Sequence, residues 1–129
     1  MNDITLFVDR DIWSHRLDAA LRAVGIPFVS HRDLFADDTP DTEWIAAVAK
    51  RGWIILTRDR RIRYRANEAA AVRTGRLHLF ALTSGNVSAA ETATIVVKAW
   101  PAIQRPVATT PPPKMWSISR GGGVSPIMG

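Results

Sequence analysis

The run WIILT at residues 53–57 limits the folds open to this chain more than any other feature. It shows no alternation of polar and apolar side chains, which is typical of a central parallel strand covered on both faces. Parallel strands need crossover connections, and these are usually helices. The run therefore predicts an α/β domain in which strands and helices alternate along the chain.

The rest of the chain fits this prediction. Apolar stretches at 4–8, 26–30 and 77–83 are expected to be strands. Segments of helical period separate them, and these predict helices from about Ile12 to Gly25, from Pro40 to Gly52, over 66–73, and from Ser88 or Ala89 to Ile103. Asp11 is expected to cap the first helix. The order predicts a central, mainly parallel sheet of four or five strands with helices on both faces and right-handed crossovers.

The composition changes after Gln104, so we expect one domain over residues 1–105 and a Pro- and Gly-rich C-terminal tail over 106–129. In this tail PVATTPPPK predicts an extended linker, KMWSISR a short edge strand, and GGGVSPIMG a flexible end. The first residues have no basic segment followed by a long apolar run, and no stretch reaches the ~18 apolar residues of a membrane span. We therefore expect a cytoplasmic protein with no membrane association.

The composition restricts the chemistry. The 129 residues contain no cysteine, which excludes disulfides, thiolate ligands and a cysteine nucleophile. Three scattered histidines argue against a structural zinc site. A bound metal would therefore be a hard cation held by carboxylates, such as Mg²⁺ or Mn²⁺.

Acidic residues fall where such a cation would need them. Asp9 follows the first predicted strand and Asp59 the third, and parallel strands end at the same edge of a sheet. Asp41 lies in the first turn of the second predicted helix. Clustered carboxylates repel each other, and a divalent cation relieves this repulsion. Secondary candidates for the same site are Asp38, Glu43 and Asn86. Each of these acids, taken singly, is better explained as a cap or turn residue, and Asn86 equally well as a turn residue.

Basic residues gather just after the third predicted strand. They are Arg58, Arg60, Arg61, Arg63 and Arg65, in a chain of net charge +5. Arginine presents a planar fork of donors that suits phosphate, so this run is a candidate nucleic-acid-binding segment. The alternative is an ordinary solvated surface.

Three segments together resemble a known family: FVDRDI near the start, then HRDLFADDTPDTEWI, then GWIILTRDRRIR. They are similar to the PIN-like domain proteins, especially the compact group that includes ribonuclease toxins of the VapC type. The resemblance covers about residues 4–105 and implies a three-layer α/β sandwich. It also implies a metal-dependent endoribonuclease of a type II toxin–antitoxin system, with Asp9, Asp41 and Asp59 as catalytic residues that bind Mg²⁺ or Mn²⁺. The implied partners are an RNA substrate and a cognate antitoxin protein.

The chain departs from the fuller PIN pattern at two points, and one of them is a spacing from Asp41 to Asp59 that is shorter than in the larger PIN domains. The fourth predicted strand is followed by TSGN, without the further acid that a usual PIN nuclease carries. The alternative hypothesis is therefore a catalytically inactive PIN-like module that binds RNA or protein. A receiver-like phosphoacceptor domain has less support, because no lysine follows the fourth strand. Homodimers are common for this fold, and the long last helix is apolar enough for an interface, so the oligomeric state stays open.

Overall fold

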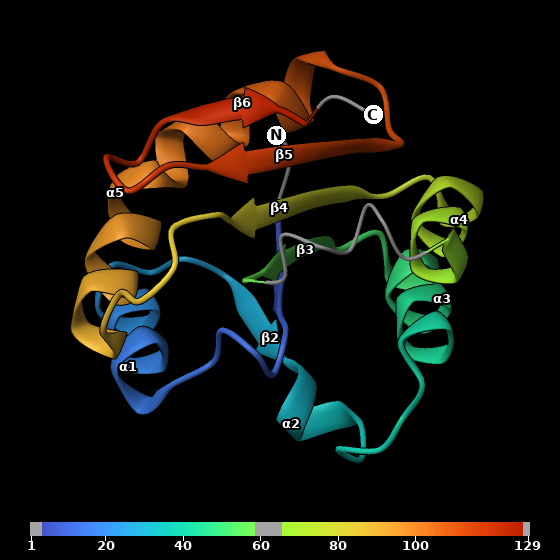
Figure 1. The fold of residues 1–129 in the computed structure, drawn as a ribbon, viewed down its shortest axis with the longest axis horizontal. Helices are drawn as coiled ribbons and strands as arrows, with labels where there is room; N and C mark the ends of the chain where they lie inside the picture. The colour runs from blue at the N-terminus through green and yellow to red at the C-terminus, as the bar shows by residue number, and fades with distance from the viewer. Residues whose placement is uncertain (1–3, 59–65, 128–129) are drawn as a thin grey trace.

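A computed structural model describes residues 4–58 and 66–127. Strands and helices alternate through most of this part of the chain (Figure 1). The strands are β1 Leu6–Val8, β2 Phe28–Ser30, β3 Ile54–Thr57, β4 His78–Leu82, β5 Lys114–Ile118 and β6 Val124–Pro126. The helices are α1 His15–Ala23, α2 His31–Leu34, α3 Asp41–Arg51, α4 Ala66–Gly75 and α5 Ala89–Thr109.

The strands form one six-stranded sheet in the order β2-β1-β3-β4-β5-β6. All neighbours pair in parallel except β5 and β6, which are antiparallel. Helices α1 and α5 cover one face of the sheet, and α3 and α4 cover the other (Figure 1). The predicted α/β class, the mainly parallel sheet and the three-layer arrangement are therefore confirmed, although the sheet has more strands than the four or five expected.

The two middle strands explain why the apolar runs in the sequence lack a polar alternation. Every residue of β3 and β4 is buried. Side chains from one face of these strands join a core beneath α1 and α5, whereas those from the other face join a core beneath α3 and α4. A strand buried on both faces needs apolar residues at nearly every position, because successive side chains point to opposite faces.

The C-terminal part of the chain differs from the extended and flexible tail that the sequence predicts. Helix α5 continues through Pro101 and Pro106 to Thr109, although each proline removes a backbone donor. Ala99 and Ile103 on its inner face are fully buried, and this packing holds the helix together. Strand β5 lies inside the sheet rather than at its edge, and the glycine-rich end supplies the edge strand β6. The strand predicted in KMWSISR is therefore confirmed, but its edge position is wrong. The extended linker and the flexible end are wrong where α5 and β6 form, because packing overrides local preference.

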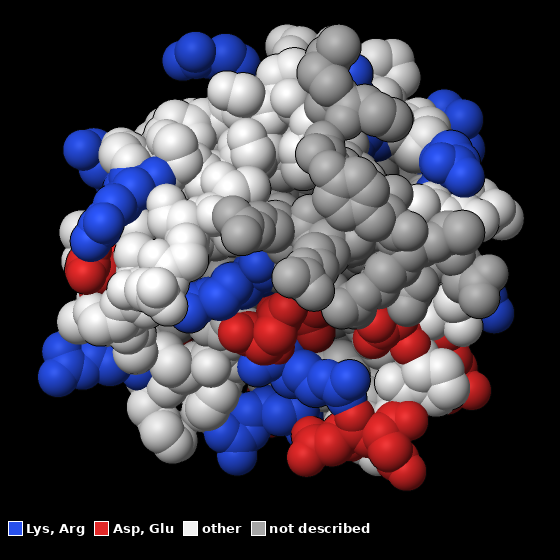
Figure 2. Space-filling model, in the orientation of Figure 1, with Lys and Arg blue, Asp and Glu red and all other residues white. Residues whose placement is uncertain are grey.

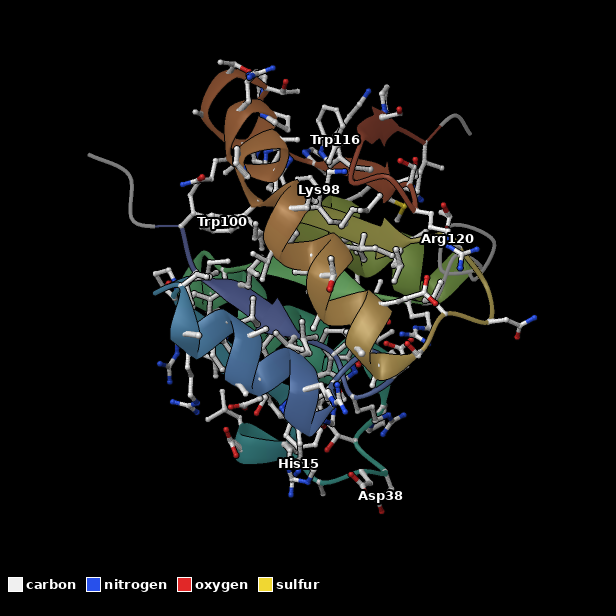
Figure 3. The ribbon with its side chains drawn as sticks, turned by 90° about the vertical axis from the view of Figure 1, so that its left-hand side faces the viewer. His15, Asp38, Lys98, Trp100, Trp116 and Arg120 are labelled. Carbon is white, nitrogen blue, oxygen red and sulfur yellow. The ribbon has the colours of Figure 1, made fainter. Side chains whose placement is uncertain are left out.

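A hydrogen-bond chain connects the C-terminal part to the middle of the sheet. The Trp116 indole Nε1 donates to His78 Nδ1 at 3.1 Å, and His78 Nε2 lies 3.0 Å from the Thr110 carbonyl oxygen. An indole only donates, so Nδ1 must accept and Nε2 must carry the hydrogen that bonds to Thr110. Burial lowers the pKa of His78, which keeps this ring neutral. Trp116 is part of β5, and its side chain belongs to the core on the face of the sheet that α5 covers (Figure 3).

In the part of the chain that the structure describes, no helix is both long and apolar enough to cross a membrane.

Candidate functional site

Asp9 lies where β1 and β3 reach the same edge of the sheet. Val8 is paired with Leu56, and the Asp9 backbone N–H donates to the Leu56 carbonyl oxygen at 2.9 Å. Thr57, the last residue of β3, is therefore brought beside Asp9 although the two are far apart in sequence. Both side chains are buried, with 7% of Asp9 and none of Thr57 exposed to solvent. Parallel strands that end together have placed a carboxylate in a poorly hydrated position.

A second carboxylate contacts the same threonine. Thr57 Oγ1 lies 3.0 Å from Asp9 Oδ2 and 3.0 Å from Asp11 Oδ1. The Arg58 backbone N–H also donates to Asp11 Oδ1, at 3.2 Å. A hydroxyl group has one hydrogen to donate, so it cannot serve both carboxylates equally. The single hydroxyl hydrogen is therefore shared between two carboxylate acceptors at this position.

The electrostatics of Asp9 reflect this crowding. Burial, reinforced by the negative charges of Asp11 and Asp41, raises the pKa of Asp9 to about 7. Hydrogen bonds from Thr57 and from the Arg10 backbone N–H oppose the rise without cancelling it. A carboxyl group that is half protonated near neutral pH binds a cation in competition with protons.

Asp41 is the third acid that acts on this position. It is the first residue of α3, and its Oδ1 accepts a hydrogen bond of 2.8 Å from the indole Nε1 of Trp44. Trp44 lies one turn further along the helix and is buried, with 1% of its surface exposed. The buried indole therefore holds a half-exposed carboxylate whose negative charge acts on Asp9. The loop before α3 allows this placement, and it contains the short helix α2 where the sequence predicted no regular structure.

The other predicted site residues are distributed unevenly. Asp59, Arg60, Arg61, Arg63 and Arg65 lie outside the described residues. Asp38, Glu43 and Asn86 are exposed, and Asn86 has a positive φ of 56° that is typical of a turn. Among the described residues no group of three or more histidine or acidic side chains is close enough to hold a metal ion. The carboxylates of Asp9 and Asp11 are nevertheless oxygen donors of the kind that Mg²⁺ and Mn²⁺ prefer.

Comparison with known proteins identifies the fold. A sequence profile described as a PIN-like domain matches residues 4–84. The chain belongs to the PIN-like domain family. It is also 28% identical, over 117 residues, to a protein from Mycobacterium tuberculosis named putative ribonuclease VapC45, and the match covers 88% of this chain and 84% of that protein. No solved structure matches. The resemblance predicted from the three sequence segments is therefore confirmed at the level of the family.

Asp11 belongs to the candidate site around Thr57, and sequence reasoning missed it. The sequence suggested that it caps the first helix, but Ser14 does so instead, because its side chain accepts the Leu17 N–H. Asp11 lies before the helix and contacts Thr57 and the Arg58 backbone. The only signal in the sequence was its spacing of two residues from Asp9. That spacing became informative only after β3 was placed beside β1.

Arg58 has a more specific position than the charge run predicts. Its Nη2 donates to the hydroxyl of the buried Thr92, at the start of α5. Its Nε is buried and has no hydrogen-bond partner among the residues that the structure describes. The Arg58 side chain thus crosses from the end of β3 to α5, beside the acids of the candidate site. Its predicted role in binding nucleic acid stays a prediction.

His31, at the start of α2, is buried in an aromatic cage. Its ring lies 6.1 Å from Phe7, 5.4 Å from Phe35 and 5.7 Å from Trp44, measured between centroids. Both ring nitrogens are buried and lack hydrogen-bond partners among the described residues. Burial and the positive charge of Arg10 lower the pKa of His31, whereas Asp37 and Asp41 act in the opposite direction. His31 is therefore a neutral core residue beside the site.

Replacing His31 with leucine is expected to stabilise the protein by about 1 kcal/mol at pH 7, because it removes two unpartnered buried nitrogens. The parent should also lose stability below about pH 6.5, because the His31 side chain is protonated there in the unfolded chain but stays neutral in the folded protein. This acid loss should be smaller in His31→Leu. Urea unfolding at pH 5, 6 and 7.5 measures both effects, with the exposed His15→Leu as control. Equal pH slopes in parent and variant would contradict the assignment.

Proposed function

We propose that this PIN-like protein is a metal-dependent endoribonuclease and the toxin of a type II toxin–antitoxin pair. The observation that carries the proposal is the convergence of Asp9 and Asp11 on the Thr57 hydroxyl, with Asp41 acting on the same position. The buried Asp9 carboxylate, raised in pKa by burial and by the charges of Asp11 and Asp41, is stabilised by a proton or by a cation. The relative named as a putative ribonuclease supports RNA as the substrate.

Asp9, Asp41 and Asp59 would hold Mg²⁺ or Mn²⁺, with Asp11 adjacent to Asp9. Asp59 is proposed from its place in the sequence, because the described acids do not form a three-ligand group by themselves. Such a cation, when bound, supplies positive charge to the scissile phosphate and lowers the pKa of water. The protein's own contribution is to hold these carboxylates in place, through Thr57 for Asp9 and Asp11 and through Trp44 for Asp41. One of the carboxylates accepts the proton of the attacking water.

The segment from Arg58 to Arg65 would hold the RNA backbone beside the acids. Figure 2 shows acidic and basic side chains side by side on the lower half of one face, over the region where Figure 1 shows β1 and β2 ending. A cognate antitoxin is the proposed protein partner, and a cytoplasmic location and a homodimer stay expectations of the same proposal.

A catalytically inactive PIN-like module that binds RNA or protein is the second candidate. One observation favours it: Glu91, the acid nearest in sequence after β4, is paired with Arg120 at 2.7 Å rather than directed to the other acids. Among the described residues, no acid after β4 joins the cluster around Asp9. The two candidate functions differ in whether the site cleaves RNA.

The deciding experiment is cleavage of a mixed RNA substrate by purified, antitoxin-free protein. We expect cutting with Mn²⁺ or Mg²⁺, no cutting with EDTA, and recovery of activity when excess metal is restored. A folded protein that cuts no RNA with either metal would overturn the nuclease and favour the binding module. Circular dichroism on the same sample establishes that the protein is folded.

A further inference from the structure

Arg32 lies over the face of an aromatic ring on the surface next to the proposed active site. Its guanidinium carbon is 4.2 Å from the centroid of the Trp13 ring. Arg32 is exposed and forms no ion pair with a described residue. The nearby acids are engaged elsewhere: Asp18 binds Arg22 at 2.7 Å, and Asp33 accepts a hydrogen bond from Ser30. The guanidinium is therefore positioned by the indole rather than by a carboxylate. We refer to these two residues as the Arg32–Trp13 stack.

The indole beneath Arg32 is held firmly. Trp13 Nε1 donates to Asp18 Oδ2 at 3.2 Å, and the ring packs against the core under α1. The His15 ring meets it edge-on, at 4.8 Å between centroids and 71° between planes. Figure 3 shows His15 at the end of α1 that is nearest to α2. A guanidinium stacked on a fixed ring loses little further freedom when a ligand binds to its outer face.

The stack lies at the same edge of the sheet as the acids. The Trp13 backbone N–H donates to the Asp9 carbonyl oxygen at 3.0 Å, so Trp13 is one turn away from Asp9. Arg32 approaches from the neighbouring strand, because β1 and β2 are paired with Val8 opposite Ser30. Adjacent strands are separated by about 4.8 Å. A nucleotide on Arg32 would therefore be a neighbour of a phosphate at Asp9.

We propose that the Arg32–Trp13 stack binds one base of a single-stranded RNA beside the scissile phosphate. This inference rests on the proposed nuclease function and adds a base-binding contact beside its active site. Unstacked bases bind to aromatic rings and to arginine planes, and every base has a face that can do so. A duplex keeps its bases stacked on one another, so the proposal predicts a preference for single strands. Arg32 would also bring positive charge next to the cluster of acids, which helps a phosphate approach.

Binding of a short fluorescent RNA in EDTA tests the stack without cleavage. Arg32→Ala is expected to weaken binding of the single strand about tenfold, a typical cost for one lost base stack. Arg32→Lys keeps the charge but not the plane, and should weaken binding about fivefold. The control variants Arg105→Ala and Arg105→Lys, at an exposed arginine near the C-terminal end of α5, should change binding less than twofold. Affinities of parent and variants that agree within twofold would overturn the proposal.

A set of oligonucleotides, each with one abasic position, separates stacking from charge. The parent should lose affinity when the stacked base is removed, and Arg32→Ala should lose nothing further at that position. If Arg32→Ala weakens binding equally for intact and abasic RNA, the contact is only electrostatic and the stack is wrong.

The parent and the Arg32→Ala variant also show whether the proposed base contact fails or the proposed nuclease activity fails. Base-dependent binding through Arg32 without any metal-dependent cutting would refute the nuclease and retain the stack. Cutting and binding that are both unchanged in Arg32→Ala would refute the stack and retain the nuclease. A folded parent that binds no RNA refutes the stack.

Discussion

Replacing Asp9 with asparagine is expected to reduce metal-dependent RNA cleavage by about a thousandfold or more, because the central carboxylate can then no longer bind a cation. The exchange conserves the shape of the side chain, so asparagine can still form one hydrogen bond with the Thr57 hydroxyl and accept another from the Arg10 N–H. The measurement is initial cleavage rate with Mn²⁺ at saturating RNA. Asp37→Asn, at an exposed acid in the neighbouring loop, is the matched control and should cut like the parent.

The same variant should be more stable than the parent when metal is absent. The pKa of Asp9 is raised to about 7, so the folded state binds a proton that the unfolded chain, with a value near 3.8, has released. This stabilisation is complete below pH 3.8 and is lost as the pH rises through 7. Asparagine carries no charge, so the stability of the variant does not fall over this pH range for the same reason. At pH 8 in EDTA, Asp9→Asn should therefore exceed the parent by roughly 1–3 kcal/mol.

Urea unfolding at pH 5 and pH 8 in EDTA measures this difference, which should be larger at pH 8. A variant that cuts as fast as the parent would remove Asp9 from the catalytic site. A variant that is inactive yet less stable at pH 8 would show that the carboxylate is not destabilised by burial. Loss of activity together with a gain of stability is the result expected for an acid that is kept for function although its charge destabilises the fold. An acid with a structural role would instead lose stability when it is replaced.

Replacing Trp44 with alanine is expected to have the largest effect on stability, about 3–5 kcal/mol. The side chain is buried to 1% exposure and stacks on Phe7 at 5.2 Å between ring centroids. Trp44 belongs to the core under α3 and α4, which positions the start of α3. A loss of this size is a large fraction of the free energy of unfolding of a small domain. Urea unfolding gives the value, and Trp100→Ala, at a half-buried site on α5, should cost clearly less.

Trp44→Phe isolates the functional part of this residue. Phenylalanine keeps a ring in the core but has no N–H group. It therefore cannot replace the 2.8 Å hydrogen bond that the Trp44 indole donates to Asp41 Oδ1. We expect a stability loss of about 1–2 kcal/mol and a roughly tenfold fall in kcat, because a group that orients a ligating carboxylate is missing. Trp100→Phe is the matched control for the exchange. Unchanged kcat in Trp44→Phe would mean that Asp41 is positioned without the indole, or is not used.

The sequence by itself determined the α/β class and the approximate positions of the first four strands. The run at 53–57 is informative because burial on both faces of a strand leaves a purely local mark. The place of Asp9 at the carboxyl edge followed from the same logic, since parallel strands end together. The family also emerged at this level, from three short segments that the profile over residues 4–84 now supports.

The tertiary structure decided what depends on contacts between distant residues. Pro106 suggests an extended linker when only its neighbours are considered, but the burial of Ile103 keeps α5 helical. Asp11 suggests a helix cap until Thr57, from a strand far along the chain, is placed against it. The position of Arg32 over Trp13 likewise requires β1 and β2 to be paired. Periodicity records which side of an element is buried, whereas the partner of a polar side chain is set only when separate elements pack together.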